Sequence, residues 1–215
     1  MRTLKTGFAV VLLSLFIFIL PAQAVPILDF ETGGPGNGGT LTLLSGGNVE
    51  GFSIPINMLT VSGTSFDGVY DVDGAFSFGS DTAALLNFNT ATNTITIVGT
   101  IPELGITTPT TLLTGSFSSF TTISGETIYL TFVGAGSDTK YTGLLEALGI
   151  PINTPFRFFD TNISVNEIDP QHYIVTSTDI TNTAAVPEPT TLILLGFGLT
   201  GIGLCRRVRK HQVKN

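Results

Sequence analysis

The sequence predicts a mainly β protein: an antiparallel β-sandwich or jelly-roll-like domain with one short helix. Threonine and serine alternate with apolar residues in many short runs, and turn sequences rich in glycine, asparagine and aspartate separate these runs. Alternation with a period of two places one set of side chains on a buried face of a strand and the other on a solvent face. Many short strands joined by such turns are typical of sandwiches and jelly rolls. An uncharged apolar segment near each end adds two flanking elements, an N-terminal signal helix and a C-terminal transmembrane helix.

Residues 1–24 are predicted to be a signal peptide. Arg2 and Lys5 give it a positive start, Phe8–Leu20 is apolar, and Ala22-Gln23-Ala24 is a small-x-small cleavage site. The secretion translocon and signal peptidase are therefore expected partners, and the mature chain is expected to begin at Val25. The alternative is an uncleaved first membrane span. The proline that follows the apolar region and the cleavage site both argue against it.

Residues 25–178 are predicted to be one acidic, β-rich exported domain, which is long enough to bury a single hydrophobic core. Its strand candidates alternate in polarity or are rich in β-branched and aromatic residues. In chain order they are Ile27–Glu31, Thr40–Leu43, Ile56–Ser62, Ala75–Phe78, Leu86–Asn89, Thr94–Val98, Leu112–Thr121, Thr127–Val133, Phe156–Val165 and Tyr173–Thr178. Glycine-rich breaks such as Gly33–Gly39 and Gly134–Gly136 are turn sequences.

One segment departs from the strand pattern. Ser137–Gly149 predicts a short helix that Ser137 or Asp138 caps and Gly149 ends, and we expect it to pack over an open end or edge of the sheets. Its apolar stripe is Tyr141, Leu144, Leu145 and Leu148. Residues 179–189 are small, polar and proline-terminated, so they are predicted to be a linker.

The charge of the chain is unevenly distributed. The formal net charge is −7, but most cations lie in the two terminal segments. Between Val25 and Val186 two cations, Lys140 and Arg157, stand against fifteen carboxylates, which leaves a charge of about −13. Such a surface repels phosphates, so nucleic acid is excluded as a partner.

The C-terminal segment combines three elements in a fixed order. Val186-Pro187-Glu188-Pro189-Thr190 is followed by an uncharged apolar run over residues 190–205. As a helix this run spans roughly 24 Å, slightly less than the about 30 Å hydrocarbon core of a membrane. A basic stop over residues 206–215 follows, which places that end in the cytoplasm and the domain outside. The stop consists of Arg206, Arg207, Arg209 and Lys210. The alternative is a buried C-terminal helix, but the run has no amphipathic stripe.

This order of elements resembles the PEP-CTERM sorting signal of Gram-negative and other diderm bacteria, a motif also named after ice-binding proteins. The resemblance covers only about residues 186–210. It implies recognition by an exosortase, a membrane-embedded cysteine transpeptidase that cuts the signal. It also implies delivery to the cell surface or the exopolysaccharide matrix, with exopolysaccharide as a further partner. It implies little about residues 25–185.

The exported domain contains no pattern that predicts catalysis. His172 is its only histidine, and the single cysteine, Cys205, lies in the tail, so neither a Cys/His nucleophile nor a His-rich zinc site can be assembled. No Gly-x-Ser-x-Gly elbow and no phosphate-binding loop is present. His172 follows the turn at Asp169-Pro170 and is interpreted as an ordinary loop residue. We therefore predict no catalytic residue and no cofactor.

An acidic cluster at residues 67–74 supports two hypotheses. Asp67, Asp71 and Asp73 are closely spaced beside glycines, and calcium prefers several oxygen ligands, so a calcium site is one hypothesis. The other, which we favour, is a hairpin with Asp-Gly turns. The full EF-hand pattern fails because Thr82, not glutamate, occupies the twelfth position counted from Asp71.

Together these features predict an exported, C-terminally sorted surface or matrix protein with a structural or binding role, and not an enzyme. A carbohydrate- or ice-binding module is the alternative, for which Thr92-x-Thr94-x-Thr96 is a short threonine ladder. An enzyme that acts on polysaccharide is a further alternative, because fifteen carboxylates offer many acid pairs. The absence of tryptophan argues mildly against sugar stacking.

Overall fold

The computed structural model describes residues 24–32, 38–73, 76–78, 81–116, 121–123, 128–131 and 137–185. Within them the chain is mainly β, with one short α-helix. The first strands are β1 (Ile27–Glu31), β2 (Thr40–Leu43), β3 (Val49–Ile56), β4 (Met58–Ser62), β5 (Gly68–Asp71), β6 (Phe76–Phe78) and β7 (Asp81–Asn89). The later strands are β8 (Thr94–Ile101), β9 (Ile106–Ser116), β10 (Thr121–Ile123), β11 (Ile128–Thr131), β12 (Ser137–Lys140), β13 (Phe156–Asp169) and β14 (His172–Ala184). The helical elements are η1 (Ser45–Gly47), η2 (Pro102–Leu104) and α2 (Thr142–Ala147).

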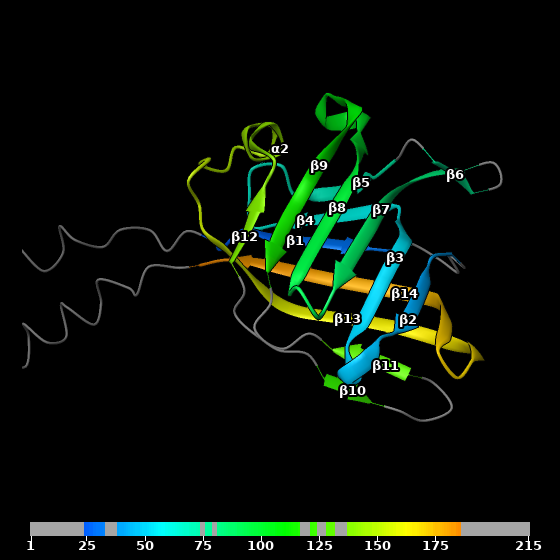
Figure 1. The fold of residues 1–215 in the computed structure, drawn as a ribbon. Helices are drawn as coiled ribbons and strands as arrows, with labels where there is room; N and C mark the ends of the chain where they lie inside the picture. The colour runs from blue at the N-terminus through cyan, green and yellow to red at the C-terminus, as the bar shows by residue number, and fades with distance from the viewer. Residues whose placement is uncertain are drawn as a thin grey trace, which may run out of the picture.

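The strands form one antiparallel sheet that curls back on itself. Its order is β10-β11-β13-β12-β9-β8-β7-β3-β2-β14-β1-β4-β5, β6 pairs with β7, and β13 also pairs with β14. The long β13–β14 hairpin changes neighbours along its length: β13 pairs with β12 and then β11, and β14 pairs with β2 and then β1. Strands β9, β8, β7 and β3 run across β1, β14 and β13 (Figure 1). A mainly β, antiparallel fold with one short helix is confirmed, whereas two separate packed sheets are not.

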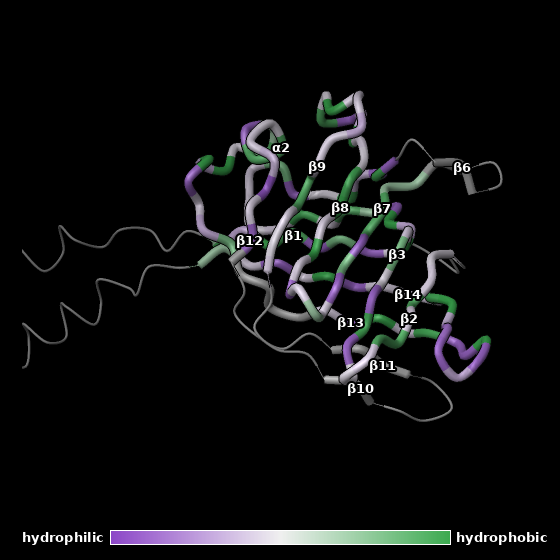
Figure 2. Tube along the Cα trace, viewed as in Figure 1, coloured by the Kyte–Doolittle hydropathy of each residue, from purple (hydrophilic) through white to green (hydrophobic). Residues whose placement is uncertain are grey.

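The hydrophobic core lies between the crossing strands. It forms one cluster that includes Phe30 from β1, Ile54 from β3, Leu86 from β7 and Ile97 from β8, all fully buried. Burying a side chain of this size contributes roughly 1.5–3 kcal/mol. Hydrophobic segments follow β9, β8 and β1 through this region (Figure 2). The core therefore joins strands that are distant in sequence, and it fixes which face of each strand points inward.

A register shift in β14 changes which of its residues face the core. Before the shift Tyr173 and Val175 are buried, whereas beyond it Ile180 and Asn182 are buried. The shift lies where Val165 pairs with Val175 but Ser164 pairs with Ser177, so β14 contains one extra residue. Because strand side chains alternate, one extra residue moves the other half of the strand to the core face. The shift thereby places the amide of Asn182 inside the protein.

Several predicted strands are confirmed, and others were missed. Ile27–Glu31 and Thr40–Leu43 match β1 and β2, and the predicted strand at Thr94–Val98 lies within β8. No strand was predicted at β3 or β5. Within β3, Gly51 needs to lack a side chain because a Cβ there would overlap the Phe88 ring. In β5 the Asp-Gly pair suggested a turn, and the strand begins at that glycine.

The predicted helix at Ser137–Gly149 is shorter than expected. Ser137–Lys140 is strand β12, and α2 begins at Thr142 without a side-chain cap, so the predicted cap at Ser137 or Asp138 is wrong. The end at Gly149 is confirmed. That residue has a φ of +66°, its N–H donates to Glu146 O at 3.1 Å, and Ile150 N donates to Leu145 O at 2.8 Å. Glycine suits this left-handed position because it has no Cβ.

The domain extends further toward the C-terminus than predicted. Strand β14 continues to Ala184 and pairs with both β1 and β13 there, so a linker that begins at residue 179 is wrong in its first part. This part of β14 has the polar composition of a linker because only alternate positions of the strand face the core. The signal helix, the transmembrane helix and the basic tail lie outside the described residues. Among the residues described, no helix is long and apolar enough to cross a membrane.

Candidate functional site

Both ends of the domain meet at one end of the molecule. Ala184 N donates a hydrogen bond to Pro26 O at 2.9 Å, and Ala185 N donates to Pro155 O at 2.7 Å. A pocket there is lined by residues 24–26, 63–65, 149–151, 154 and 184–185. The start of β1 (blue) and the end of β14 (orange) lie together in Figure 1. Ala24 and Val25, the two residues that flank the predicted signal-peptide cleavage, therefore lie beside Ala184 and Ala185 at the end of the described chain.

The predicted sorting residues Val186–Thr190 and the basic stop at Arg206, Arg207, Arg209 and Lys210 lie outside the described residues, as does Ala22. Strand β14 ends at Ala184, two residues before Val186.

The three aspartates of the calcium hypothesis lie at separate positions. Asp67 closes the turn between β4 and β5: its Oδ1 accepts hydrogen bonds from Thr64 N at 2.6 Å and from Thr64 Oγ1 at 3.2 Å. The N–H of Thr64 holds the pKa of Asp67 below its ordinary value, because it stabilises the charged form. Asp71 ends β5, and Asp73 bridges to Thr100. Across the described ranges, no three His, Cys, Asp or Glu side chains form a metal-holding group.

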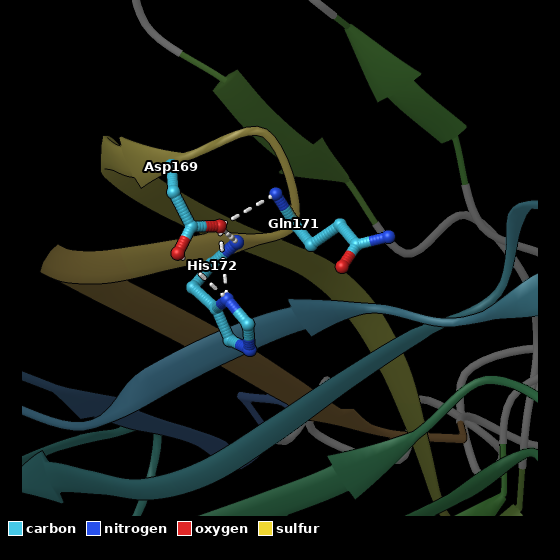
Figure 3. Close-up of polar contacts among 3 residues, drawn as sticks. All are labelled: Asp169, Gln171 and His172. Atoms are coloured by element: carbon cyan, nitrogen blue, oxygen red, sulfur yellow. Dashed lines mark hydrogen bonds and ion pairs between the residues drawn. The ribbon is translucent and has the colours of Figure 1, made fainter.

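His172 is the first residue of β14 and directly follows the turn that joins β13 to β14 (Figure 3). Asp169 Oδ1 accepts hydrogen bonds from Gln171 N and His172 N, both at 2.9 Å, and it lies 2.9 Å from His172 Nδ1. The backbone bond from Gln171 is the main reason why the pKa of Asp169 is below its ordinary value. The imidazole is half exposed. These contacts order the hairpin turn. His172 is exposed, but it begins strand β14 and is therefore not a loop residue.

A group of carboxylates lies on the outer face of β1 and β14. Asp29 is opposite Thr181, and Glu31 is opposite Asp179. Thr181 Oγ1 lies 3.3 Å from Asp29 Oδ1 and 3.2 Å from Asp179 Oδ1, and it donates to one at a time. Burial, followed by the hydrogen bond and negative charge of Asp179, raises the pKa of Asp29 to about 7. The outer face of these strands therefore changes charge near neutral pH.

The second polar group is buried and contains one of the two cations of the domain. The side chains of Lys140 and Asp138 are fully buried on β12, and Lys140 Nζ lies 2.6 Å from Asp138 Oδ2. Nζ also donates to Asn182 Oδ1 on β14 and lies 4.7 Å from the centre of the Phe156 ring. Asn182 Nδ2 donates to Ile180 O at 3.2 Å. An amine, a carboxyl group and an amide thus meet in an apolar setting.

Burial controls the charge of this group. It lowers the pKa of Lys140 to about 8, against the opposing effect of the Asp138 charge. It also raises the pKa of Asp138, again against the effect of its partner. Asp138 Oδ1 is buried and has no hydrogen-bond partner among the described residues. Burial therefore favours the neutral form of both the Lys140 amine and the Asp138 acid more than water does.

Sequence reasoning missed this group. Asp138 was interpreted as a helix cap, and Lys140 was counted only as a rare cation. The available signal was the spacing of the two residues, because positions two apart lie on the same face of a strand. That signal becomes informative only once residues 137–140 are known to be a strand, and the position of Asn182 depends on the register shift in β14.

Comparison with known proteins identifies the C-terminal segment. Residues 185–210 match the family model of the PEP-CTERM protein-sorting motif. No curated protein and no solved structure matches the chain. The chain therefore carries a PEP-CTERM sorting motif directly after the last strand of its curled sheet.

Proposed function

We propose that this protein is exported, is sorted through its C-terminal motif, and serves at the cell surface or in the exopolysaccharide matrix in a non-catalytic, structural or binding role. The sorting motif over residues 185–210 carries this proposal. The translocon and signal peptidase export the chain, and the segment over residues 190–205 holds it in the membrane with the domain outside. An exosortase then cuts the signal.

The position of the last strand supports this order of events. Strand β14 ends at Ala184, so a cut at the Pro-Glu-Pro motif removes no strand from the sheet. A cut within the predicted linker at residue 179 would instead remove the part of β14 that pairs with β1 and β13. The boundary found in the structure therefore suits a domain that stays folded after its anchor is removed.

The experiment is deletion of Pro187–Asn215 in the native host, followed by fractionation into cytoplasm, membrane, surface and medium. Loss of the domain from the surface and its appearance in the medium are expected. A matched variant in which Pro187, Glu188 and Pro189 are all alanine keeps the apolar run and the basic stop. It should stay in the membrane with its tail uncut. An unchanged surface location for both variants would refute the proposal.

A specific observation favours ligand binding as a second candidate role. Asn87, Thr96 and Thr114 are register partners across β7, β8 and β9, and so are Asn89, Thr94 and Ser116. Thr94, Thr114 and Ser116 are exposed. Hydroxyl and amide groups thus form two parallel rows on one face of three strands. Such an array suits a hydroxyl-rich ligand such as a polysaccharide, or ice.

This second role is tested by replacing Thr94 and Thr114 with valine. The change keeps the β-branched shape and removes two hydroxyls from the rows. Weaker retention on the host exopolysaccharide is expected for a carbohydrate-binding face, and loss of thermal hysteresis for an ice-binding face. Equal behaviour of the variant and the wild type in both assays contradicts the role.

A further inference from the structure

We propose that Lys140 and Asn182 form an intramolecular isopeptide bond, in which Lys140 Nζ is joined to Asn182 Cγ and the carboxyl group of Asp138 transfers the protons. The bond covalently ties β12 to β14. It does not depend on sorting, because every group it needs lies within residues 138–182.

The geometry brings the reacting atoms together. Lys140 Nζ contacts Asn182 Oδ1, and Cγ is bonded to that oxygen at about 1.2 Å, so the amine lies beside the amide carbon. The bond from Asn182 Nδ2 to Ile180 O, 3.2 Å long, fixes the amide plane. Asp138 Oδ2 is 2.6 Å from Nζ, within reach for direct proton transfer.

The surroundings favour the reactive protonation states. An ammonium group cannot attack a carbonyl carbon, so the amine has to lose its proton first. Lys140 and Asp138 have fully buried side chains, and burial disfavours the charged form of each. The Phe156 ring, 4.7 Å from Nζ, covers the amine with an apolar surface. Transfer of one proton from Nζ to Asp138 Oδ2 therefore gives a neutral amine and a carboxylic acid in place.

The reaction is balanced without any other reactant. The lone pair of Nζ attacks Asn182 Cγ, and the π electrons of the carbonyl move to Oδ1. The Asp138 acid gives its proton to Nδ2, and its carboxylate then takes a proton from Nζ, which is bonded to the same carbon. The Cγ–Nδ2 bond breaks, the carbonyl re-forms and ammonia leaves. Amine plus primary amide has become a secondary amide plus NH3, and Asp138 ends with the proton that it took from Nζ before the attack.

The proposed bond lies on β14, the strand that connects the domain to its C-terminal membrane anchor. Strand β14 leads directly into the sorting segment, so a pull on the C-terminal anchor is applied to this strand first. Its partner β12 has only two register pairs with β13. Lys140 also pairs with Leu113 of β9. A covalent bond from Asn182 to Lys140 therefore connects the loaded strand to β12, which lies on the other side of β13.

The test is denaturing intact-mass analysis of the full chain, purified in detergent, with its two ends assigned by terminal peptides. The wild type should be lighter than its sequence by one NH3. An Asp138→Asn variant should have the full sequence mass. Asp179→Asn is the matched control, since it removes an acid from the outer face of β14, and it should keep the loss of NH3.

Peptide mapping separates the bond from other losses of ammonia. Cyclisation of Asn182 onto its own backbone also releases NH3, but it leaves the backbone after Lys140 open to trypsin. The proposed bond should block that cleavage and yield a branched peptide that contains both residues. A wild type at full sequence mass, or one with separate linear peptides for Lys140 and Asn182, overturns the proposal.

Discussion

Replacing the buried polar group by apolar residues gives a test in which the sign of the stability change is decisive. The variant is Asp138→Leu, Lys140→Met and Asn182→Leu together, so that no charge or amide remains buried without a partner. A purely non-covalent buried ion pair is seldom more stable than well-packed apolar side chains, and its replacement is neutral or stabilises by about 1–4 kcal/mol. If the variant also loses a covalent cross-link, its stability is instead expected to fall below that of the wild type.

The magnitude follows from the separation of the two linked residues. Lys140 and Asn182 are 42 residues apart in sequence. For a cross-link that closes a loop of this length, the chain-entropy relation gives about 13 cal/mol/K, which is about 4 kcal/mol at room temperature. The variant should therefore unfold more easily than the wild type by roughly this amount, less any gain from apolar packing.

The assay is guanidinium unfolding followed by far-ultraviolet circular dichroism, which does not need the tryptophan that the chain lacks. A lower unfolding midpoint for the triple variant is expected. A midpoint above that of the wild type would show that no covalent bond is lost, because the gain from apolar packing can at most offset the loss of the cross-link, and it would refute the cross-link.

Three further changes test other parts of the structure. Asp29→Asn should remove a pH dependence: the pKa of Asp29 is raised from 3.8 to about 7, so the folded state binds the extra proton between these values and wild-type stability falls as the pH rises through them. Urea midpoints between pH 4 and 8 check this, and a wild-type slope that persists in the variant contradicts it. Gly149→Ala should lower stability by about 1–2 kcal/mol because φ is +66°, whereas Gly68→Ala, in β5, provides a glycine with ordinary φ and room for a Cβ for comparison in thermal unfolding. Gly51→Ala should cost about 1–3 kcal/mol because its Cβ meets the Phe88 ring, and the additional Phe88→Leu change should recover part of that loss. Equal stability of Gly51→Ala and the wild type would show that this close approach is not needed.

The sequence was informative where alternation and burial agree. In β1 and β8 the apolar residues recur at every second position and face one core, so these strands could be predicted. In β14 the register shift at residues 175–177 changes the buried face, and the second half of the strand reads as polar. That half was predicted to be a linker. Local periodicity cannot reveal such a shift, because it depends on pairing with β13.

The buried polar group could not be predicted for a related reason. Asp138 and Lys140 are polar residues on a core-facing position of a strand, which is the opposite of the usual pattern. Their burial depends on three strands that are far apart in sequence, β9, β13 and β14. The sorting motif was predictable, in contrast, because its three elements are contiguous and need no tertiary contact.

The most direct test of the proposed function is the intact mass of the protein recovered from the surface of the native host. A chain that begins at Val25 and ends within Val186–Thr190 is expected, since signal peptidase and exosortase remove the two terminal segments. The remaining residues contain every strand of the curled sheet. Recovery of a chain that still carries residues 190–215 at the cell surface would contradict removal of the sorting signal.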